Sequence, residues 1–370
     1  MELSASKYVN KPVLVFWETT KACDLTCLHC RATSMKSPAE GELDQEQSIE
    51  FLDQLTMFDG KPPVLILTGG DVMKKKGLDR VLERAGELKI PFALSPAVTG
   101  LQNDGAIELI RTSGASSISI SLDGRREFHD LIRGAGIYDS TLRTLDTMKK
   151  IGVNLQVNTL VSGDNLADLP YVLKILLDRG IRTWEIFFLI KVGRGVGIND
   201  VTPEQYDAVN RYLVFVSGYG INVRTVEGPY FRKLADDHNN ARLGVGNDIF
   251  ESLRQSTIEL CGVPDHADDM IPIARTSDGN GVIFVSHDGN VKPSGFLPMD
   301  LGNVLNQPLV DIYRHNPVLQ RLRDRNNLAS PCLECPYREI CGGSRARAFY
   351  YSGDVLGRDP VCPLSIKREN

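Results

Sequence analysis

Short, continuous apolar runs alternate with amphipathic stretches through the first two-thirds of the chain, and this alternation constrains the fold most. The apolar runs cover residues 13–17, 64–67, 92–95, 117–121, 155–161, 184–190 and 221–226. The amphipathic stretches between them cover 44–58, 78–88, 105–113, 138–151 and 165–179. Continuously apolar strands separated by helices are typical of a parallel sheet covered by helices. With at least six such units, the pattern predicts an α/β fold, as a partial or complete barrel.

This pattern ends near residue 227, which sets the predicted domain boundaries. Residues 228–270 look irregular and polar, and we expect them to bridge two domains. A hairpin is then predicted from the apolar run 282–286, the turn His287-Asp288-Gly289-Asn290 and the following Val291-Lys292. The sequence thus predicts a core domain over 1–227, a bridging segment over 228–270 and a cysteine-rich domain over 271–370.

Eight cysteines form two groups and one isolated residue, at positions 23, 27, 30, 261, 332, 335, 341 and 362. The N-terminal residues are polar and lack the apolar core of a signal peptide, so we expect a cytoplasmic protein with reduced thiols. No apolar stretch is long enough to span a membrane. The net charge of -5 gives no reason to expect nucleic acid or an anionic membrane as a partner. Two metal centres are the interpretation that fits these cysteines.

The first group, Cys23-x-x-x-Cys27-x-x-Cys30, comes directly after the first predicted strand. Iron–sulfur clusters are held by cysteine thiolates, usually four, so three ligands leave one iron open to a small molecule. Zinc is the alternative, but the only nearby fourth ligand is His29, which lies between two of the cysteines. The spacing therefore favours a cluster with an open iron.

This motif after a first strand resembles the signature of the radical S-adenosylmethionine (SAM) superfamily, and the similarity extends over nearly the whole chain. The resemblance implies a partial (β/α)6 barrel in which Cys23, Cys27 and Cys30 hold a 4Fe-4S cluster. SAM would chelate the open iron. One electron, with reduced ferredoxin or flavodoxin as the expected donor, would split SAM into methionine and a 5′-deoxyadenosyl radical that takes a hydrogen atom from substrate.

Further motifs at predicted strand ends resemble the SAM-binding motifs of that family. They supply the residues that the resemblance assigns to the cofactor: Gly69, Gly70, Asp71, Ser95, Asp123, Arg133, Asn158 and Arg194. Asp71 would meet the amino group of SAM, in place of the commoner glutamate. Arg133 would reach the SAM carboxylate, which a planar guanidinium can bond twice. Asn158, inside an otherwise apolar strand, would be costly to bury without a partner, and a ribose hydroxyl could be one. Each motif taken singly could also be structural.

The C-terminal group, with Cys332, Cys335, Cys341 and Cys362, has four cysteines, enough to close the coordination of one cluster or one zinc ion. The surrounding residues resemble the auxiliary-cluster domain called SPASM, or its shorter Twitch form, and this resemblance implies a second 4Fe-4S cluster. The family usually has a cysteine where Ser294 stands. Cys261 is either a spare ligand or, as we favour, a free thiol.

A further resemblance indicates the class of substrate. The motifs resemble those of radical SAM proteins of heme d1 and alternative heme biosynthesis, which implies a small tetrapyrrole with carboxylate side chains. Arg345 and Arg347 could pair with such carboxylates, or bond loop carbonyls instead. Glu18, at the end of the first strand, could relay a proton or cap a helix. Maturation of a ribosomal peptide is the alternative activity, and a metal-stabilised binding protein is the non-enzymatic one.

Overall fold

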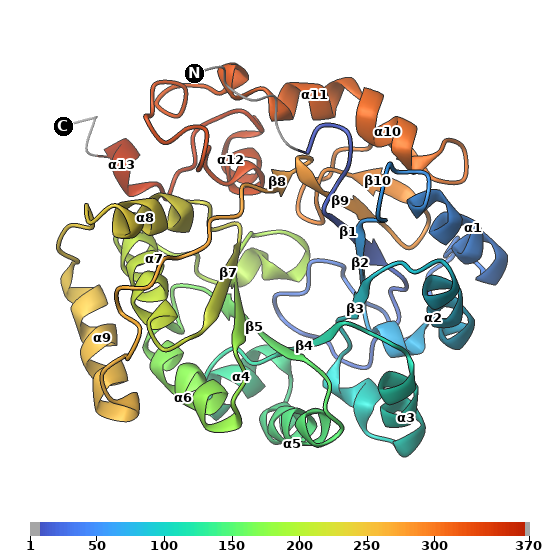
Figure 1. The fold of residues 1–370 in the computed structure, drawn as a ribbon, viewed down its shortest axis with the longest axis horizontal. Coiled ribbons are helices and arrows are strands. Elements are labelled where there is room, and N and C mark those ends of the chain that lie inside the picture. The colour runs from blue at the N-terminus through green and yellow to red at the C-terminus, as the bar shows by residue number, and fades with distance from the viewer. Residues whose placement is uncertain (1–7, 367–370) are drawn as a thin grey trace. The chain divides into compact units, whose positions relative to one another are not determined.

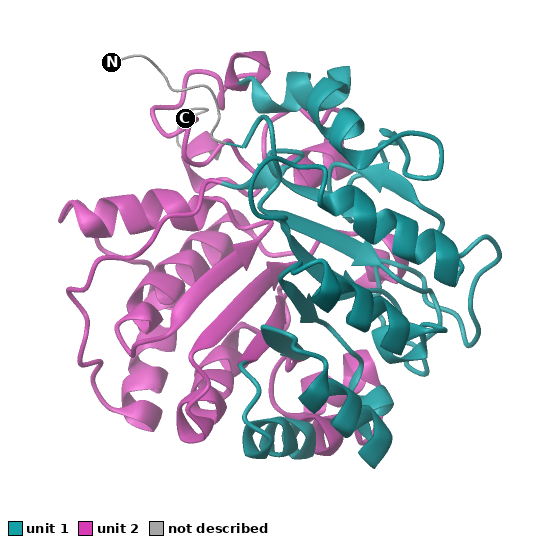
Figure 2. Ribbon diagram, turned by 45° about the vertical axis from the view of Figure 1, so that its right-hand side comes forward, with its two compact units in different colours: residues 1–120, 142–154, 276–324 teal, residues 121–141, 155–275, 325–370 magenta. Residues whose placement is uncertain are grey.

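The computed structural model describes residues 8–366, so the polar residues 1–7 and the last four residues lie outside the description. Contacts divide the chain into two compact units, which Figure 2 shows in different colours. Unit 1 comprises residues 1–120, 142–154 and 276–324, and unit 2 comprises 121–141, 155–275 and 325–370. The predicted domain boundaries at residues 227 and 270 both fall inside unit 2, and they stay a prediction.

Unit 1 is built on parallel strands that coincide with the first predicted apolar runs. These are β1 (Leu14–Glu18), β2 (Val64–Thr68), β3 (Phe92–Leu94) and β4 (Ser117–Ser121, whose last residue belongs to unit 2). They pair in the order β1-β2-β3-β4. Alternate residues are buried, and in β1 Val15 and Trp17 are inaccessible to solvent.

Helices follow these strands as predicted. They are α1 (Gln45–Leu55), α2 (Leu78–Glu87), α3 (Asp104–Thr112) and α5 (Ile137–Lys150, shared by both units), with the short 3-10 turns η1 (Val72–Lys74) and η2 (Val98–Leu101). In Figure 1, α1, α2 and α3 lie along one side of the strands of unit 1. A capping box between Asp44 and Gln47 starts α1 and supplies the hydrogen bonds that its first turn lacks. Each helix is thus placed to cover the apolar side chains of a strand.

The predicted hairpin is confirmed, and it extends the sheet of unit 1. β9 (Gly281–Val285) and β10 (Asn290–Lys292) are antiparallel, and β9 also pairs in parallel with β1. β8 (Ser277–Asp278) and β11 (Gly302–Asn303) add short edges, and α10 (Leu309–His315) and α11 (Pro317–Arg323) follow. Because Val285 is in register with Trp17, the hairpin turn lies beside the carboxyl end of β1.

Unit 2 has its own parallel strands, β5 (Leu155–Val161), β6 (Thr183–Phe188) and β7 (Asn222–Val226). Its first helices are α4 (Arg126–Arg133), α6 (Leu169–Arg179) and α7 (Pro203–Ser217), with η3 (Leu166–Asp168) and η4 (Gly193–Gly197). The C-terminal part adds η5 (Arg325–Asn327), α12 (Arg345–Ser352) and α13 (Pro363–Ile366). As in unit 1, strands and helices alternate, as the sequence predicted.

The expectation of irregular structure over 228–270 is wrong. This segment contains α8 (Tyr230–Asn239), which packs on α7, and α9 (Asp248–Cys261), which packs on α6 and α7. The sequence did not predict α8 because the polar run 236–240 forms the C-terminal end of this helix. Its buried residues Tyr230, Phe231 and Leu234 lie at the other end. No helix in the described residues is long and apolar enough to cross a membrane.

Candidate cluster and cofactor sites

The three N-terminal cysteines lie in one loop that begins after β1. The Cys30 amide donates to the Cys27 carbonyl at 3.2 Å, and the Leu25 amide donates to Cys23 Sγ at 3.3 Å. Burial raises the pKa of the Cys23 thiol to about 11, and the nearby Cys27 and Cys30 add to the increase. The loop therefore gathers three thiols around buried Cys23, and an amide already donates to one sulfur. This donor set fits a cluster held by three cysteines.

The Gly-Gly-Asp turn after β2 lies directly against this loop. The Gly70 amide donates to the Thr20 carbonyl and the Asp71 amide to the Ala22 carbonyl, each at 2.7 Å. A Cβ atom on Gly69 would lie 2.4 Å from the Thr20 carbonyl oxygen, and one on Gly70 would lie 2.5 Å from that of Ala22. Both positions thus require glycine because two backbones meet there, and the turn holds the cysteine loop in place.

Asp71 has a buried oxygen without a partner in the described part of the chain. Its Oδ1 atom accepts from the amides of Met73 at 3.1 Å and Ala97 at 3.2 Å, whereas Oδ2 accepts no hydrogen bond. Burial raises the pKa of this carboxyl group to about 6. A buried carboxylate oxygen of this kind is costly unless a cation meets it, so Asp71 fits an ammonium ligand. Ser95, half-buried just after β3, lies two residues before Ala97.

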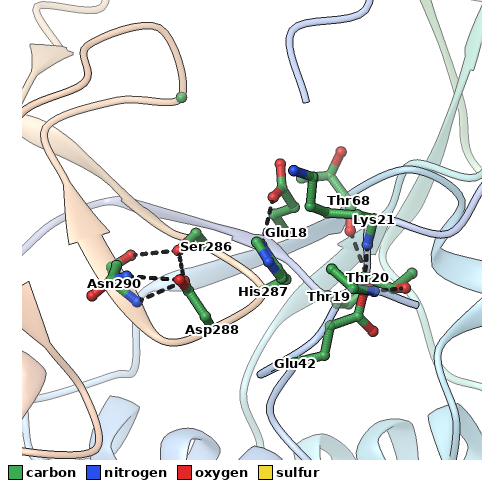
Figure 3. Close-up of polar contacts among 12 residues, drawn as sticks. Glu18, Thr19, Thr20, Lys21, Glu42, Thr68, Ser286, His287, Asp288 and Asn290 are labelled. Atoms are coloured by element: carbon green, nitrogen blue, oxygen red, sulfur yellow. Dashed lines mark hydrogen bonds and ion pairs between the residues drawn. The ribbon is translucent and has the colours of Figure 1, made fainter. Parts of the chain in front are cut away.

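Glu18 forms a buried charged cluster that sequence reasoning did not find. Its carboxylate accepts from Arg31 at 3.0 Å. It also lies 3.1 Å from His287 Nδ1 in the hairpin turn, as Figure 3 shows. Arg31 also donates to the Gly295 carbonyl and stacks on the Phe284 ring. Burial raises the pKa of Glu18, but the hydrogen bond from His287 and the Arg31 charge outweigh it, so the pKa is lowered. Ionised Glu18 thus connects Arg31, which directly follows Cys30, to the hairpin turn.

In unit 2, Asp123 and Arg133 form a pair. Asp123 is fully buried, accepts from the Leu160 amide at 2.8 Å and accepts a hydrogen bond from Arg133 Nε. His129 Nδ1 accepts from the Asp123 amide at 3.1 Å, and burial lowers the pKa of His129 to about 4. Asp123 was predicted to bind the cofactor, but its contacts position Arg133, whose side chain remains 15% exposed.

The two other predicted cofactor residues of unit 2 lie in a strand and in a 3-10 turn. Asn158, in β5, is half-buried and accepts from Gln156 Nε2 at 2.8 Å. Gln156 in turn also donates to Glu185, so a protein side chain partly supplies the partner that we expected from a ribose hydroxyl. Arg194 lies in η4 and is half-buried. The roles of both residues toward SAM stay predictions.

The four C-terminal cysteines line a single pocket of unit 2. Cys332, Cys335, Cys341 and Cys362 surround it together with Tyr206, Tyr230, Lys233, Tyr337, Arg338, Gly342, Gly343, Asp359 and Leu364. Gly342 and Gly343 adopt φ angles of +70° and +69°, which turn the chain back after Cys341. In the described residues, no three potential ligands meet the geometry for one metal ion. The pocket brings together the full predicted ligand set.

Polar groups near two of these sulfurs favour the thiolate. The Gly343 amide lowers the pKa of Cys341 in part, and the Leu364 and Ser365 amides and the Ser365 side chain do the same for Cys362. Burial nevertheless raises the pKa of Cys341 to about 12 and also raises that of Cys362. Amide donors directed at cysteine sulfurs favour the thiolate form, so the pocket fits a cluster with four cysteine ligands.

Cys261 lies apart from this pocket. It is the last residue of α9, and the charges that act on it come from Lys174 and Asp178 in α6. Cys261 is not among the described residues that line the cysteine pocket. This placement favours the interpretation of Cys261 as a free thiol.

Arg345 and Arg347 are buried in structural contacts. Arg345 donates to the carbonyls of Val355 at 2.9 Å and Gly357 at 2.8 Å. Arg347 is fully buried, with Asp200 at 3.5 Å and Asp359 at 3.6 Å. These contacts favour the alternative that both arginines bond loops of unit 2, and their proposed catalytic role gains no support from the geometry.

Comparison with known proteins identifies the family. The radical SAM superfamily matches residues 17–202, and the SPASM iron–sulfur cluster-binding domain matches residues 277–336. AdoMet-dependent heme synthase of Oleidesulfovibrio alaskensis is 31% identical over 96% of this chain and 88% of that protein. Pre-heme d1 synthase of Dinoroseobacter shibae is 28% identical over 96% of this chain and 87% of its own length. Streptococcus suis SuiB, solved with its precursor peptide SuiA, shares the fold with a TM-score of 0.68 at 16% identity, covering 96% of this chain and 76% of SuiB.

These matches confirm the predicted α/β fold with its parallel sheet, the C-terminal SPASM domain and the predicted cofactors. The radical SAM domain binds a 4Fe-4S cluster and SAM, and the SPASM domain binds auxiliary iron–sulfur clusters. They also confirm an enzyme rather than a metal-stabilised binding protein. The match to residues 17–202 and the cysteine loop inside it lead to one conclusion: this chain belongs to the radical SAM superfamily.

Proposed function

We propose that this enzyme oxidises or removes a carboxylate-bearing side chain of a tetrapyrrole. The observation that carries the proposal is the similarity, over 96% of the chain, to a protein named AdoMet-dependent heme synthase. A relative named pre-heme d1 synthase, similar over the same share of the chain, supports the same class of substrate. A small-molecule substrate in the cytoplasm and a reduced ferredoxin or flavodoxin as electron donor complete the proposal.

The chain's own residues divide the work as follows. Cys23, Cys27 and Cys30 hold the cluster that binds SAM, and the unpartnered Oδ2 atom of Asp71 meets the SAM amino group. Within unit 2, Asp123 orients Arg133, the residue that the family resemblance assigns to the SAM carboxylate. When bound, SAM and the two clusters supply hydrogen-atom abstraction and an acceptor for one electron.

Atoms and electrons balance in the proposed reaction, with SAM taking the hydrogen atom and a cluster taking the electron. Abstraction of a hydrogen atom from the carbon next to the carboxymethyl group leaves a substrate radical. Loss of the carboxylate as CO2 then forms a carbon–carbon double bond and releases one electron. No proton has to move in this step, but a side-chain oxidation would release one. Glu18 with His287 is the buried pair of unit 1 suited to relay it, which favours the relay over a helix cap for Glu18.

The test is product analysis by mass spectrometry. The anaerobically reconstituted, reduced enzyme is incubated with SAM and either iron-coproporphyrin or siroheme-derived substrates. We expect about eight irons per chain, as two four-iron clusters, and a product that has lost CO2 or hydrogen from a side chain. SAM-dependent turnover of a peptide with no tetrapyrrole bound would instead support peptide maturation. Zinc in place of the second cluster would contradict the assignment of Cys332, Cys335, Cys341 and Cys362.

A further inference from the structure

In unit 2, a tyrosine hydroxyl on helix α7 has no hydrogen-bond partner among the described residues, although it lies where the C-terminal cysteines gather. Tyr206 is fully buried, and among the described residues its hydroxyl forms no hydrogen bond. Buried hydroxyl groups are almost always bonded, because losing water without a replacement is costly. The ring itself is well packed, edge-to-face with Phe188 at 4.8 Å and beside Tyr230 at 5.9 Å. Packing therefore explains the ring and leaves the hydroxyl unexplained.

The surroundings of this hydroxyl are those of the cysteine pocket. Tyr206 lines the pocket with all four C-terminal cysteines. Cys341 and Cys362 are among the groups whose charges act on the phenol. The turn of helix that follows Cys362, α13, packs against α7, and the Arg347 guanidinium lies 5.3 Å from the Tyr206 ring. The partner missing from the protein must therefore come from whatever fills this pocket.

We propose that Tyr206 donates a hydrogen bond to a sulfur atom of the auxiliary cluster and thereby raises the reduction potential of that cluster. The proposal rests on the assignment of Cys332, Cys335, Cys341 and Cys362 as its ligands. Cluster sulfides and cysteine thiolates are acceptors, while a tyrosine hydroxyl that is protonated at neutral pH is a donor. Hydrogen bonds to cluster sulfurs are one of the established determinants of potential.

The direction of the effect follows from charge. Reduction adds an electron to the cluster, so its sulfurs become better acceptors and the Tyr206 hydrogen bond becomes stronger. This bond thus stabilises the reduced form more than the oxidised form. If loss of this hydrogen bond lowers the ratio of reduced to oxidised cluster about tenfold at a given potential, the reduction potential falls by about 59 mV for a one-electron couple.

The test replaces Tyr206 by phenylalanine, which removes only the hydroxyl. Tyr212→Phe is the matched control, because Tyr212 is on the same helix and is also fully buried, but its hydroxyl bonds Thr257 at 2.9 Å. The full chain with both clusters is titrated with reductant and followed by electron paramagnetic resonance. Adding SAM identifies the signal of the first cluster, which is the one with an open iron. We expect Tyr206→Phe to lower the auxiliary potential and Tyr212→Phe to leave it unchanged.

A second readout separates this role from a merely structural one. In the iron-free chain, Tyr206→Phe removes an unsatisfied hydroxyl, so its melting temperature should equal or exceed that of wild type. In the loaded chain, the same change should lower it. An unchanged auxiliary potential in an eight-iron Tyr206→Phe variant overturns the role of Tyr206 alone. A wild-type chain that binds only four irons overturns the ligand assignment and the proposal with it.

Discussion

Replacing Gly70 by alanine should disturb the cysteine loop through the backbone alone. The added Cβ would lie 2.5 Å from the Ala22 carbonyl oxygen and 2.7 Å from that of Lys21. Real Cβ contacts are not this short, and both neighbours are backbone atoms that cannot rotate away as a side chain could. The loop that leads into Cys23 must therefore move away from the turn after β2.

The cost can be worked from the contacts involved. Overpacking at a rigid site costs about 1–3 kcal/mol. The movement also weakens the bonds from Gly70 to Thr20 and from Asp71 to Ala22, both 2.7 Å long, each with a net value of about 1 kcal/mol. We expect Gly70→Ala to lower the free energy of unfolding of the iron-free chain by about 2–4 kcal/mol. Iron bound at the first cluster and 5′-deoxyadenosine formation should fall with it.

Gly86→Ala is the matched control, because a Cβ at Gly86 meets no atom within 4 Å. Gly86 lies inside α2, so alanine there should raise the free energy of unfolding by up to about 1 kcal/mol. Chemical unfolding in urea gives both stabilities, and iron analysis gives cluster occupancy. A Gly70→Ala variant with wild-type stability and iron content would show that the turn and the cysteine loop are not in contact as described.

Three further changes test individual sites. Cys27→Ala should abolish SAM cleavage while the chain still folds, so undiminished 5′-deoxyadenosine from this variant would refute the three-cysteine cluster. Cys261→Ser should leave the iron content unchanged, and loss of a cluster would make Cys261 a ligand. Asp71 has its pKa raised by burial from 3.8 to about 6, so the folded iron-free chain binds this proton more tightly than the unfolded chain. The stability of wild type relative to Asp71→Asn should therefore fall as the pH rises from about 4 to 6, by up to about 1.4 kcal/mol per pH unit, and a difference that is independent of pH would contradict the raised pKa.

The apolar residues were a sound guide to the strands, because side chains of a strand point alternately to its two faces and those on the core face are apolar and buried. The predicted runs 117–121 and 155–161 coincide with β4 and β5. The helices of 228–270 were missed since their buried side chains are few and spaced among charged ones. The first cluster could be predicted from cysteine spacing, because Cys23, Cys27 and Cys30 are close together in sequence and chemically distinctive. The second was predicted from the resemblance to the SPASM domain, since four cysteines alone fit a cluster or zinc.

Contacts between distant segments were beyond the sequence. Glu18 and His287 are 269 residues apart, and they meet only because β9 pairs with β1. The sequence of the hairpin does not indicate that β1 is the strand with which it pairs. Tyr206 was overlooked in the same way, because its significance depends on α7 lying beside cysteines more than a hundred residues later.

Both cysteine groups show the same balance between burial and donors, and this links cluster loading to protons. Burial raises the pKa of Cys23 to about 11 and of Cys341 to about 12, so in the iron-free chain these thiols are protonated at neutral pH. Iron binds thiolates, and loading must therefore release those protons. The Leu25 amide donates to Cys23 Sγ, and the Gly343 amide lowers the pKa of Cys341 in part, so each sulfur has a nearby amide that favours the thiolate. The fold thus keeps Cys23 and Cys341 as thiols in the iron-free chain and stabilises their thiolates when iron binds.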